Sequence, residues 1–158
     1  MIGPIVADVL KENIAFEIDA ERIKTGIDKE RHNVAKTNVN TIQALCKKIL
    51  QAVADGINKC PINVRRLLAV SAEEAEKKFP EEKAAGEMVV GGLLFLRFIC
   101  PAVITPHLFG IGSEPLSNSA RTLTLITKVL QNIVNQVKSE NKKEPYMNLL
   151  SQFTLNQI

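Results

Sequence analysis

The stretch GEMVVGGLLFLRFIC, residues 86–100, decides the fold class of this chain. Its residues are apolar almost all the way round a helix, which is typical of a core element. Gly91 and Gly92 lie in its middle, and each costs a helix roughly 1 kcal/mol relative to alanine. Such a cost predicts a place where another backbone approaches closely. A buried strand of a parallel sheet is the alternative, but no other segment of the chain resembles a companion strand.

Upstream of this stretch, hydrophobic spacing predicts several shorter elements. A short helix is expected over residues 4–11, and a longer one over residues 42–56 with Asn40 or Thr41 as its cap. Residues 17–37 are charged, contain glycine and are weakly periodic, so they are expected to be mostly loop. The residues of the 42–56 helix that should face the core are Ile42, Leu45, Ile49, Ala52 and Val53.

Prolines mark the boundaries of the remaining predicted helices. Pro61 opens a predicted helix over residues 61–78, and Pro80 follows its end. Pro101 and Pro106 are expected to break the apolar helix and to bracket a short turn. The inward positions of the 61–78 helix should be Ile62, Leu67, Leu68 and Ala75. Together these segments predict an all-α fold, an irregular helical bundle.

Composition narrows the functional class. The chain has 158 residues, enough for one domain with a core, and is 46% hydrophobic and 23% charged. Its net charge of +3 is too small for a nucleic-acid-binding footprint, and its seven aromatic residues are not interleaved with basic ones. The mild positive charge favours an acidic patch on a protein partner.

Cysteine usage and hydropathy predict a cytoplasmic protein. Cys46, Cys60 and Cys100 are an odd number of widely spaced thiols, which argues against a disulfide framework or a zinc site. No signal peptide is visible. The longest apolar run, residues 88–96, is shorter than a bilayer span and is followed by Arg97. No transmembrane segment is therefore expected.

A polar stripe runs along the helix predicted over residues 117–137. Arg121, Lys128 and Asn135 are seven residues apart, so they drift by only about 20° per step and form one line. This line should lie opposite an apolar side. A solvated face and a docking ridge for an acidic partner both fit the stripe, and periodicity does not choose between them. The apolar side contains Leu123, Ile126, Leu130, Ile133, Val134 and Val137.

Three blocks in order resemble the Ras GTPase-activating proteins. The blocks are GGLLFLRFICPA at 91–102, ARTLTLITK at 120–128 and KEPYM at 143–147. The resemblance is strongest between them and extends more weakly back to the start of the chain. It implies a partial Ras-GAP domain over residues 1–158, all-α and incomplete on its N-terminal side.

The resemblance also implies roles for individual residues. Arg97 is similar to a second family arginine that braces the loop carrying the catalytic arginine, and Leu96 would contact the switch region of the GTPase. Cys100 replaces an asparagine found in other GTPase-activating families. The implied partner is a Ras-family small GTPase in its GTP-bound form; GTP and Mg²⁺ belong to that partner, and no cofactor of the chain itself is expected. The implied contact residues are Leu96, Arg97, Pro101, Ala102, Arg121, Lys128, Asn135 and Lys143.

The catalytic arginine is not expected among these 158 residues. In the family it lies in a Phe-Arg-x-Asn loop, well before the region that resembles the start of this chain. Arg31, in RHNVAK at 31–36, mimics part of that loop but lacks the preceding phenylalanine and lies too far downstream. The expectation is a docking surface without the arginine finger, acting in the cytoplasm or at the inner face of the plasma membrane.

Two alternatives stay open. One is a finger-less module that captures active GTPases and competes with their effectors. The other is a helical scaffold without GTPase-activating activity, in which Arg121 and Lys128 are ordinary surface residues. An independent enzyme is the least expected reading, because no nucleophile–base set, metal cluster or phosphate-binding glycine loop is present.

Overall fold

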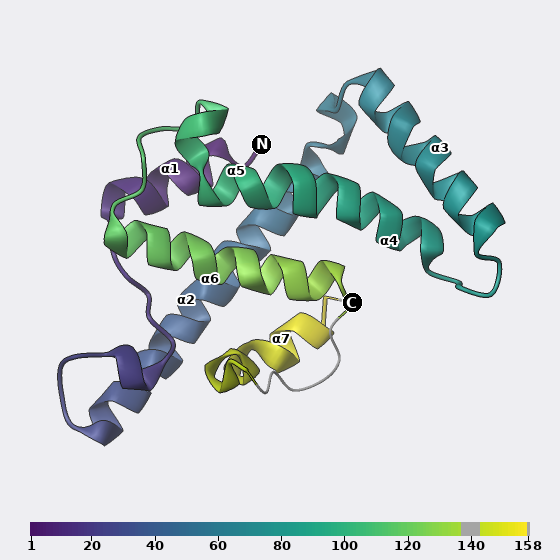
Figure 1. The fold of residues 1–158 in the computed structure, drawn as a ribbon. Coiled ribbons are helices and arrows are strands. Elements are labelled where there is room, and N and C mark those ends of the chain that lie inside the picture. The colour runs from purple at the N-terminus through teal and green to yellow at the C-terminus, as the bar shows by residue number, and fades with distance from the viewer. Residues whose placement is uncertain (137–142, 158) are drawn as a thin grey trace.

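The computed structural model describes residues 1–136 and 143–157, and within these residues the fold is all-α, with no strand (Figure 1). This confirms the predicted fold class. The first half contains α1 (Gly3–Glu12), the 3₁₀ turn η1 (Ala20–Arg22), α2 (Asp28–Asp55), the 3₁₀ turn η2 (Ile57–Lys59) and α3 (Ile62–Lys78). The second half contains α4 (Ala85–Gly91), the π-helical segment η3 (Gly92–Ile99), α5 (Cys100–Ile104), the 3₁₀ turn η4 (Pro106–Phe109), α6 (Ser117–Val134), the 3₁₀ segment η5 (Pro145–Leu150) and α7 (Ser151–Leu155).

Helix α6 is the centre of the core. It crosses α2 in Figure 1 and contacts α1, α2, α5, η3 and α7. Four of the six residues predicted to form its apolar side are buried, which confirms the prediction for them. Val134 is half-buried, and Val137 lies outside the described residues. The helix ends at Val134, three residues before the predicted end, and Gln136 then adopts a left-handed backbone with φ of 51°. The buried members of the predicted side are Leu123, Ile126, Leu130 and Ile133.

The loop predicted over residues 17–37 is wrong in its second half. Helix α2 begins at Asp28, so Asn40 and Thr41 lie inside the helix and cap nothing. The carboxylate of Glu30 accepts the backbone N–H of Ile27 at 3.0 Å and satisfies a donor at the helix start. Ala35 and Val39 continue the buried face that begins again at Ile42, so packing extends the helix through a charged segment.

The helix predicted over 61–78 is confirmed as α3, but its inward face is partly wrong. Ala75 is buried and Leu68 is half-buried, because this side packs against α4. Ile62 and Leu67 are 51% and 61% exposed. Helix α3 stands at the edge of the molecule in Figure 1.

Pro101 does not break the apolar helix, contrary to the prediction. Helical backbone continues from Ala85 through Ile104, and Pro101 lies in the first turn of α5 directly after the π-helical segment η3. A π-helical turn changes the hydrogen-bond pattern just before proline, whose ring would clash with the carbonyl four residues back in a regular helix. The backbone N–H and hydroxyl of Thr105 both donate to the Pro101 carbonyl at 2.9 Å.

The apolar run is longer and less buried than predicted. Among residues 1–136 and 143–157, Ala85–Ile104 is the one helical run long and apolar enough to cross a bilayer by length and composition, with a mean hydropathy of 1.9. Core helices of soluble proteins meet the same criterion. Only Ala85, Gly86 and the segment around Cys100 are fully buried, so the helix lies along the core and is not enclosed by it.

The two central glycines should respond oppositely to alanine. A Cβ on Gly91 would lie 2.9 Å from Cγ1 of Val134, a side chain with little rotameric freedom. A Cβ on Gly92 would meet only Nη1 of Arg97, at 3.7 Å. The predicted close approach thus exists at Gly91, to a side chain and not to a backbone.

We expect Gly91→Ala to destabilise the fold by about 1 kcal/mol, because overpacking exceeds the gain in helix propensity. The matched Gly92→Ala should stabilise it by about 0.5–1 kcal/mol. Urea denaturation of both variants measures the difference. Equal effects of the two substitutions would show that Val134 moves aside.

Candidate functional site

Arg121 and Lys128 face away from the buried side of α6, as predicted, but of the three stripe residues only Asn135, at the C-terminal cap of the helix, is exposed. Arg121 and Lys128 are partly buried because carboxylates from distant parts of the chain cover them. The stripe is therefore neither a simple solvated face nor a row of free cations. We call the cluster formed by Glu17, Arg121, Lys128, Glu144 and Tyr146 the charge network.

The first half of the charge network is a bidentate ion pair between Arg121 and Glu17. Nε and Nη2 of Arg121 donate to the two carboxylate oxygens of Glu17 at 2.8 and 2.7 Å, and the side chains are 18% and 14% exposed. The backbone N–H groups of Ile18 and Asp19 also donate to Glu17, each at 3.0 Å. Burial raises the pKa of this carboxyl, but these hydrogen bonds and the Arg121 charge together lower it by more. The net pKa therefore lies below the usual value of a glutamate.

The second half joins α6 to the segment that leads into η5. Lys128 donates to Glu144 and, at 3.5 Å, to the hydroxyl of Tyr146, which itself donates to Glu144. These hydrogen bonds from Lys128 and Tyr146 lower the pKa of Glu144 despite a small opposing effect of burial. The guanidinium carbon of Arg121 lies 5.6 Å from the centre of the Tyr146 ring, within cation–π range. Tyr146 thus touches both cations and links the two halves.

The other predicted site residues lie on the neighbouring η3–α5 helix. Arg97 is exposed, and its Nη1 donates to the Gly92 carbonyl at 3.0 Å, so it rests on its own helix and contacts no member of the charge network. Leu96 and Pro101 are half-buried, and Ala102 is buried. Helices α5 and α6 pack side by side, which brings the two groups onto adjacent helices. Lys143 is exposed and precedes Glu144.

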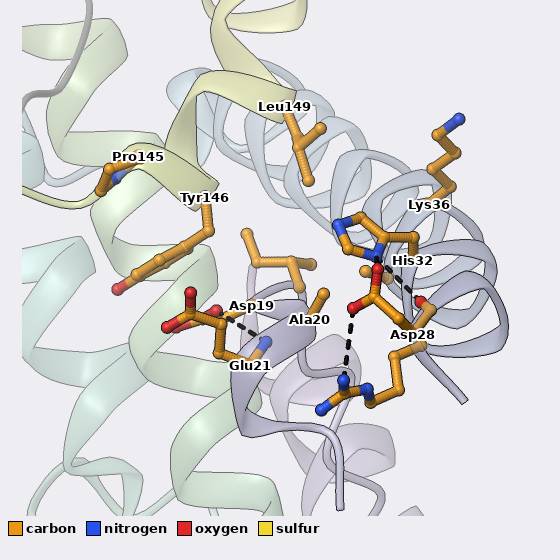
Figure 2. A pocket seen from close by; sticks show the side chains of 12 residues that line it. Asp19, Ala20, Glu21, Asp28, His32, Lys36, Pro145, Tyr146 and Leu149 are labelled. Carbon is orange, nitrogen blue, oxygen red and sulfur yellow. Dashed lines mark hydrogen bonds and ion pairs between the residues drawn. The ribbon is translucent and has the colours of Figure 1, made fainter. Parts of the chain in front are cut away.

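A pocket of about 420 Å³ adjoins the charge network on the far side of Tyr146 (Figure 2). Figure 2 shows Tyr146 and Leu149 of the η5 segment facing Asp28 and His32 of α2 across it. Asp28 is engaged by Arg31 at 3.2 Å and by Nδ1 of His32 at 3.6 Å. Tyr146 lines this pocket and also belongs to the charge network, so its position depends on both the charge network and the packing of η5 against α2.

Sequence reasoning missed Glu17, Glu144 and Tyr146 as members of the site. Glu144 and Tyr146 stand inside the KEPYM block, so that block carried a signal for them. Nothing near Glu17 pointed to Arg121, because the two residues are 104 positions apart.

Nucleophilic or metal chemistry finds no support in the part of the chain that the structure describes. No group of three or more His, Cys, Asp or Glu side chains there is placed to hold a metal ion. Burial raises the pKa of the Cys100 thiol to about 11, so it carries very little thiolate near neutral pH. The site can offer cations, amides and an apolar wall, which is the chemistry of protein docking.

Comparison with known proteins gives a consistent result. Residues 1–135 match the family model of GTPase-activator protein for Ras-like GTPase. The chain is 29% identical over 99% of its length to "Probable Ras GTPase-activating-like protein ngap" of Dictyostelium discoideum and 30% identical over 90% of its length to "GTPase-activating protein" of Drosophila melanogaster. It is also 36% identical over 68% of its length to "RAS protein activator like-3" of Bos taurus. The chain spans 17%, 12% and 10% of these three relatives.

Proposed function

We propose that this chain, which belongs to the family of GTPase-activator proteins for Ras-like GTPases, docks on the GTP-bound form of a Ras-like small GTPase. The outward side of α6 and the adjacent η3–α5 helix would form the contact surface. The observation that carries the proposal is the pair Arg121 and Lys128, held by ion pairs on the outward side of a helix whose other side is buried, with the exposed Asn135 at the C-terminal end of that helix. The long apolar helix falls inside the family match, which supports its assignment to the domain core.

The geometry divides the predicted contact residues into two kinds. The hydrogen bonds of Arg121 and Lys128 go to Glu17 and Glu144 of the same chain, so we assign these two cations the task of positioning the segments around Glu17 and Lys143. The side chains of Asn135, Arg97 and Lys143 are exposed, so we assign them direct contact with the GTPase, although Arg97 and Lys143 also have interactions within the chain. GTP and Mg²⁺ would come with the partner, in the cytoplasm or at the inner face of the plasma membrane.

The docking proposal predicts binding that depends on the nucleotide. We expect the chain to bind a GTP-loaded Ras-like GTPase at least about tenfold more tightly than the GDP-loaded form. Asn135→Glu should weaken binding to the GTP form by about tenfold, because it places a like charge opposite an acidic partner. Biolayer interferometry with both nucleotide states measures these affinities.

Asn63→Glu is the matched control, because Asn63 is an exposed asparagine on α3, away from the contact surface. It should leave binding within about twofold of the unchanged chain. Absence of binding to both nucleotide states would favour a helical scaffold without a GTPase partner. Equal binding to the two states, or equal effects of the two glutamate variants, would contradict the proposed docking surface.

A further inference from the structure

Helix α3 carries an outward face that no other part of the described chain covers. Residues 62, 66, 69, 70, 73 and 77 fall within an arc of about 100° on the side opposite the buried Ala75. Ile62 and Val70 on this face are 51% and 55% exposed. Two exposed aliphatic side chains on one helix face give an apolar contact for another helix.

The outward face carries charges of both signs along α3. Arg66 lies in the first half of the helix and Glu73 lies two turns later. Lys77 lies in the last turn, where a basic residue suits the helix dipole, and it is paired with Glu74 at 2.8 Å. Within residues 1–136 and 143–157, neither Arg66 nor Glu73 makes a hydrogen bond or an ion pair. Both charges are therefore available to a partner.

An antiparallel copy of the same helix satisfies both observations. If two α3 helices cross where Ala69 and Val70 meet, Arg66 of each faces Glu73 of the other, and Ile62 of each lies beside the methylene stem of Lys77. A two-fold contact repeats each pair twice, and the two helix dipoles run in opposite directions. The small side chain of Ala69 lets the helices approach closely at the crossing.

We propose that the outward face of α3 is a self-association surface on which a second copy of this chain docks in antiparallel orientation. Helix α3 has 17 residues, hence a length of about 25 Å, so the buried area falls at the low end of stable interfaces. The dimer is therefore weak and reversible. In Figure 1, α3 stands at the edge of the molecule, apart from α6, so the dimer contact does not involve the α6 part of the proposed GTPase-binding surface.

Charge reversal tests the pairing directly. Sedimentation equilibrium of the 158-residue chain should show a concentration-dependent dimer. Arg66→Glu alone and Glu73→Arg alone should each weaken the dimer by at least about tenfold, because two attractive pairs become repulsive. The double variant should restore it. A mixture of the two single variants should form heterodimers more tightly than either variant forms homodimers. Lys48→Glu, the same charge change at an exposed site on α2, should leave association unchanged.

Disulfide trapping supplies a second readout of the orientation. In a Cys60→Ser background, a mixture of Ile62→Cys and Lys77→Cys chains should form mixed disulfide dimers under mild oxidation. Either variant alone should form far fewer. A chain that stays monomeric at several hundred micromolar overturns the proposal, as does association that is equal in all charge variants. If these variants lost GTPase binding, the loss would count against the position of the proposed docking surface and would leave the self-association result unaffected.

Discussion

The 158-residue polypeptide is expected to accelerate GTP hydrolysis by a bound Ras-like GTPase by less than about tenfold, even at saturating concentration. Ras with its activator reaches an acceleration of about 10⁵-fold, most of it from an arginine that stabilises charge on the transferring phosphate. A docking surface without that arginine orders the GTPase but adds no charge at the γ-phosphate. The expected deficit is thus several orders of magnitude.

All six arginines of the chain lie in helices or 3₁₀ segments, which supports the expectation that none of them acts as a finger. A finger must extend from a loop beside the docking surface with a free guanidinium. Arg31 is engaged by Asp28 in the first turn of α2, and Arg97 and Arg121 are held by hydrogen bonds within the chain. The remaining three are Arg22, the last residue of η1, which is paired with Asp19, and Arg65 and Arg66 on α3.

A single-turnover assay with GTP-loaded GTPase measures the effect. A chimaera in which a finger-bearing segment from a Ras GTPase-activating protein of established activity precedes Met1 is the positive control, and it should restore most of the acceleration. Stimulation above about 10³-fold by the 158 residues alone would contradict the expectation. In that event Arg31→Ala would show whether Arg31 acts as the finger.

Sequence patterns correctly predicted the helices that begin at a proline, because proline restricts the backbone directly. Pro4 lies in the first turn of α1, and Pro61 immediately precedes α3, as expected. The apolar side of α6 was also predictable, because four of its residues repeat at helical spacing and are all buried. In each case the prediction depended only on residues close together in the sequence.

The predictions were wrong where the structure of a segment depends on contacts with distant parts of the chain. The start of α2 looks like a loop because its charged residues hide the buried positions Ala35 and Val39, which matter only once α2 packs. Helix α3 has apolar residues on two faces, and periodicity does not tell which face meets α4. Pro101 was expected to end a helix, but a π-helical segment before it accommodates the ring.

The candidate site shows the same division. Arg121, Lys128 and Asn135 could be placed on one line from their spacing; in the structure the first two lie on α6 and Asn135 is the residue that caps its C-terminal end. Their exposure could not be predicted, since Glu17 and Glu144 approach from other elements. A spacing rule concerns one helix, whereas partial burial of a cation depends on which carboxylates the fold brings to it.

Arg121→Met is expected to lower the free energy of unfolding by about 2–3 kcal/mol at pH 7, because it leaves the carboxylate of Glu17 partly buried without its cation. Removing one partner of a fully buried pair costs about 3–5 kcal/mol; the smaller value applies here because water still reaches both side chains. For a chain of this size, the melting temperature should fall by about 5–10 °C. Arg22→Met is the matched control, since Arg22 is 60% exposed in its pair with Asp19, and it should cost less than about 1 kcal/mol.

The pH dependence separates the ion pair from simple loss of packing. Since the folded-state pKa of Glu17 is depressed below 4.5, its stabilisation is complete above the unfolded-state pKa and is lost as the pH falls through the folded-state value. In Arg121→Met, burial acts on Glu17 without the opposing cation, so the carboxyl is protonated more readily. The stability difference between Arg121→Met and the unchanged chain should therefore shrink as the pH falls through the range between the Glu17 pKa of the variant and the depressed Glu17 pKa of the unchanged chain. Urea denaturation from pH 3 to pH 7 tests this, and a difference that stays constant across the range would mean that Arg121 contributes by packing alone.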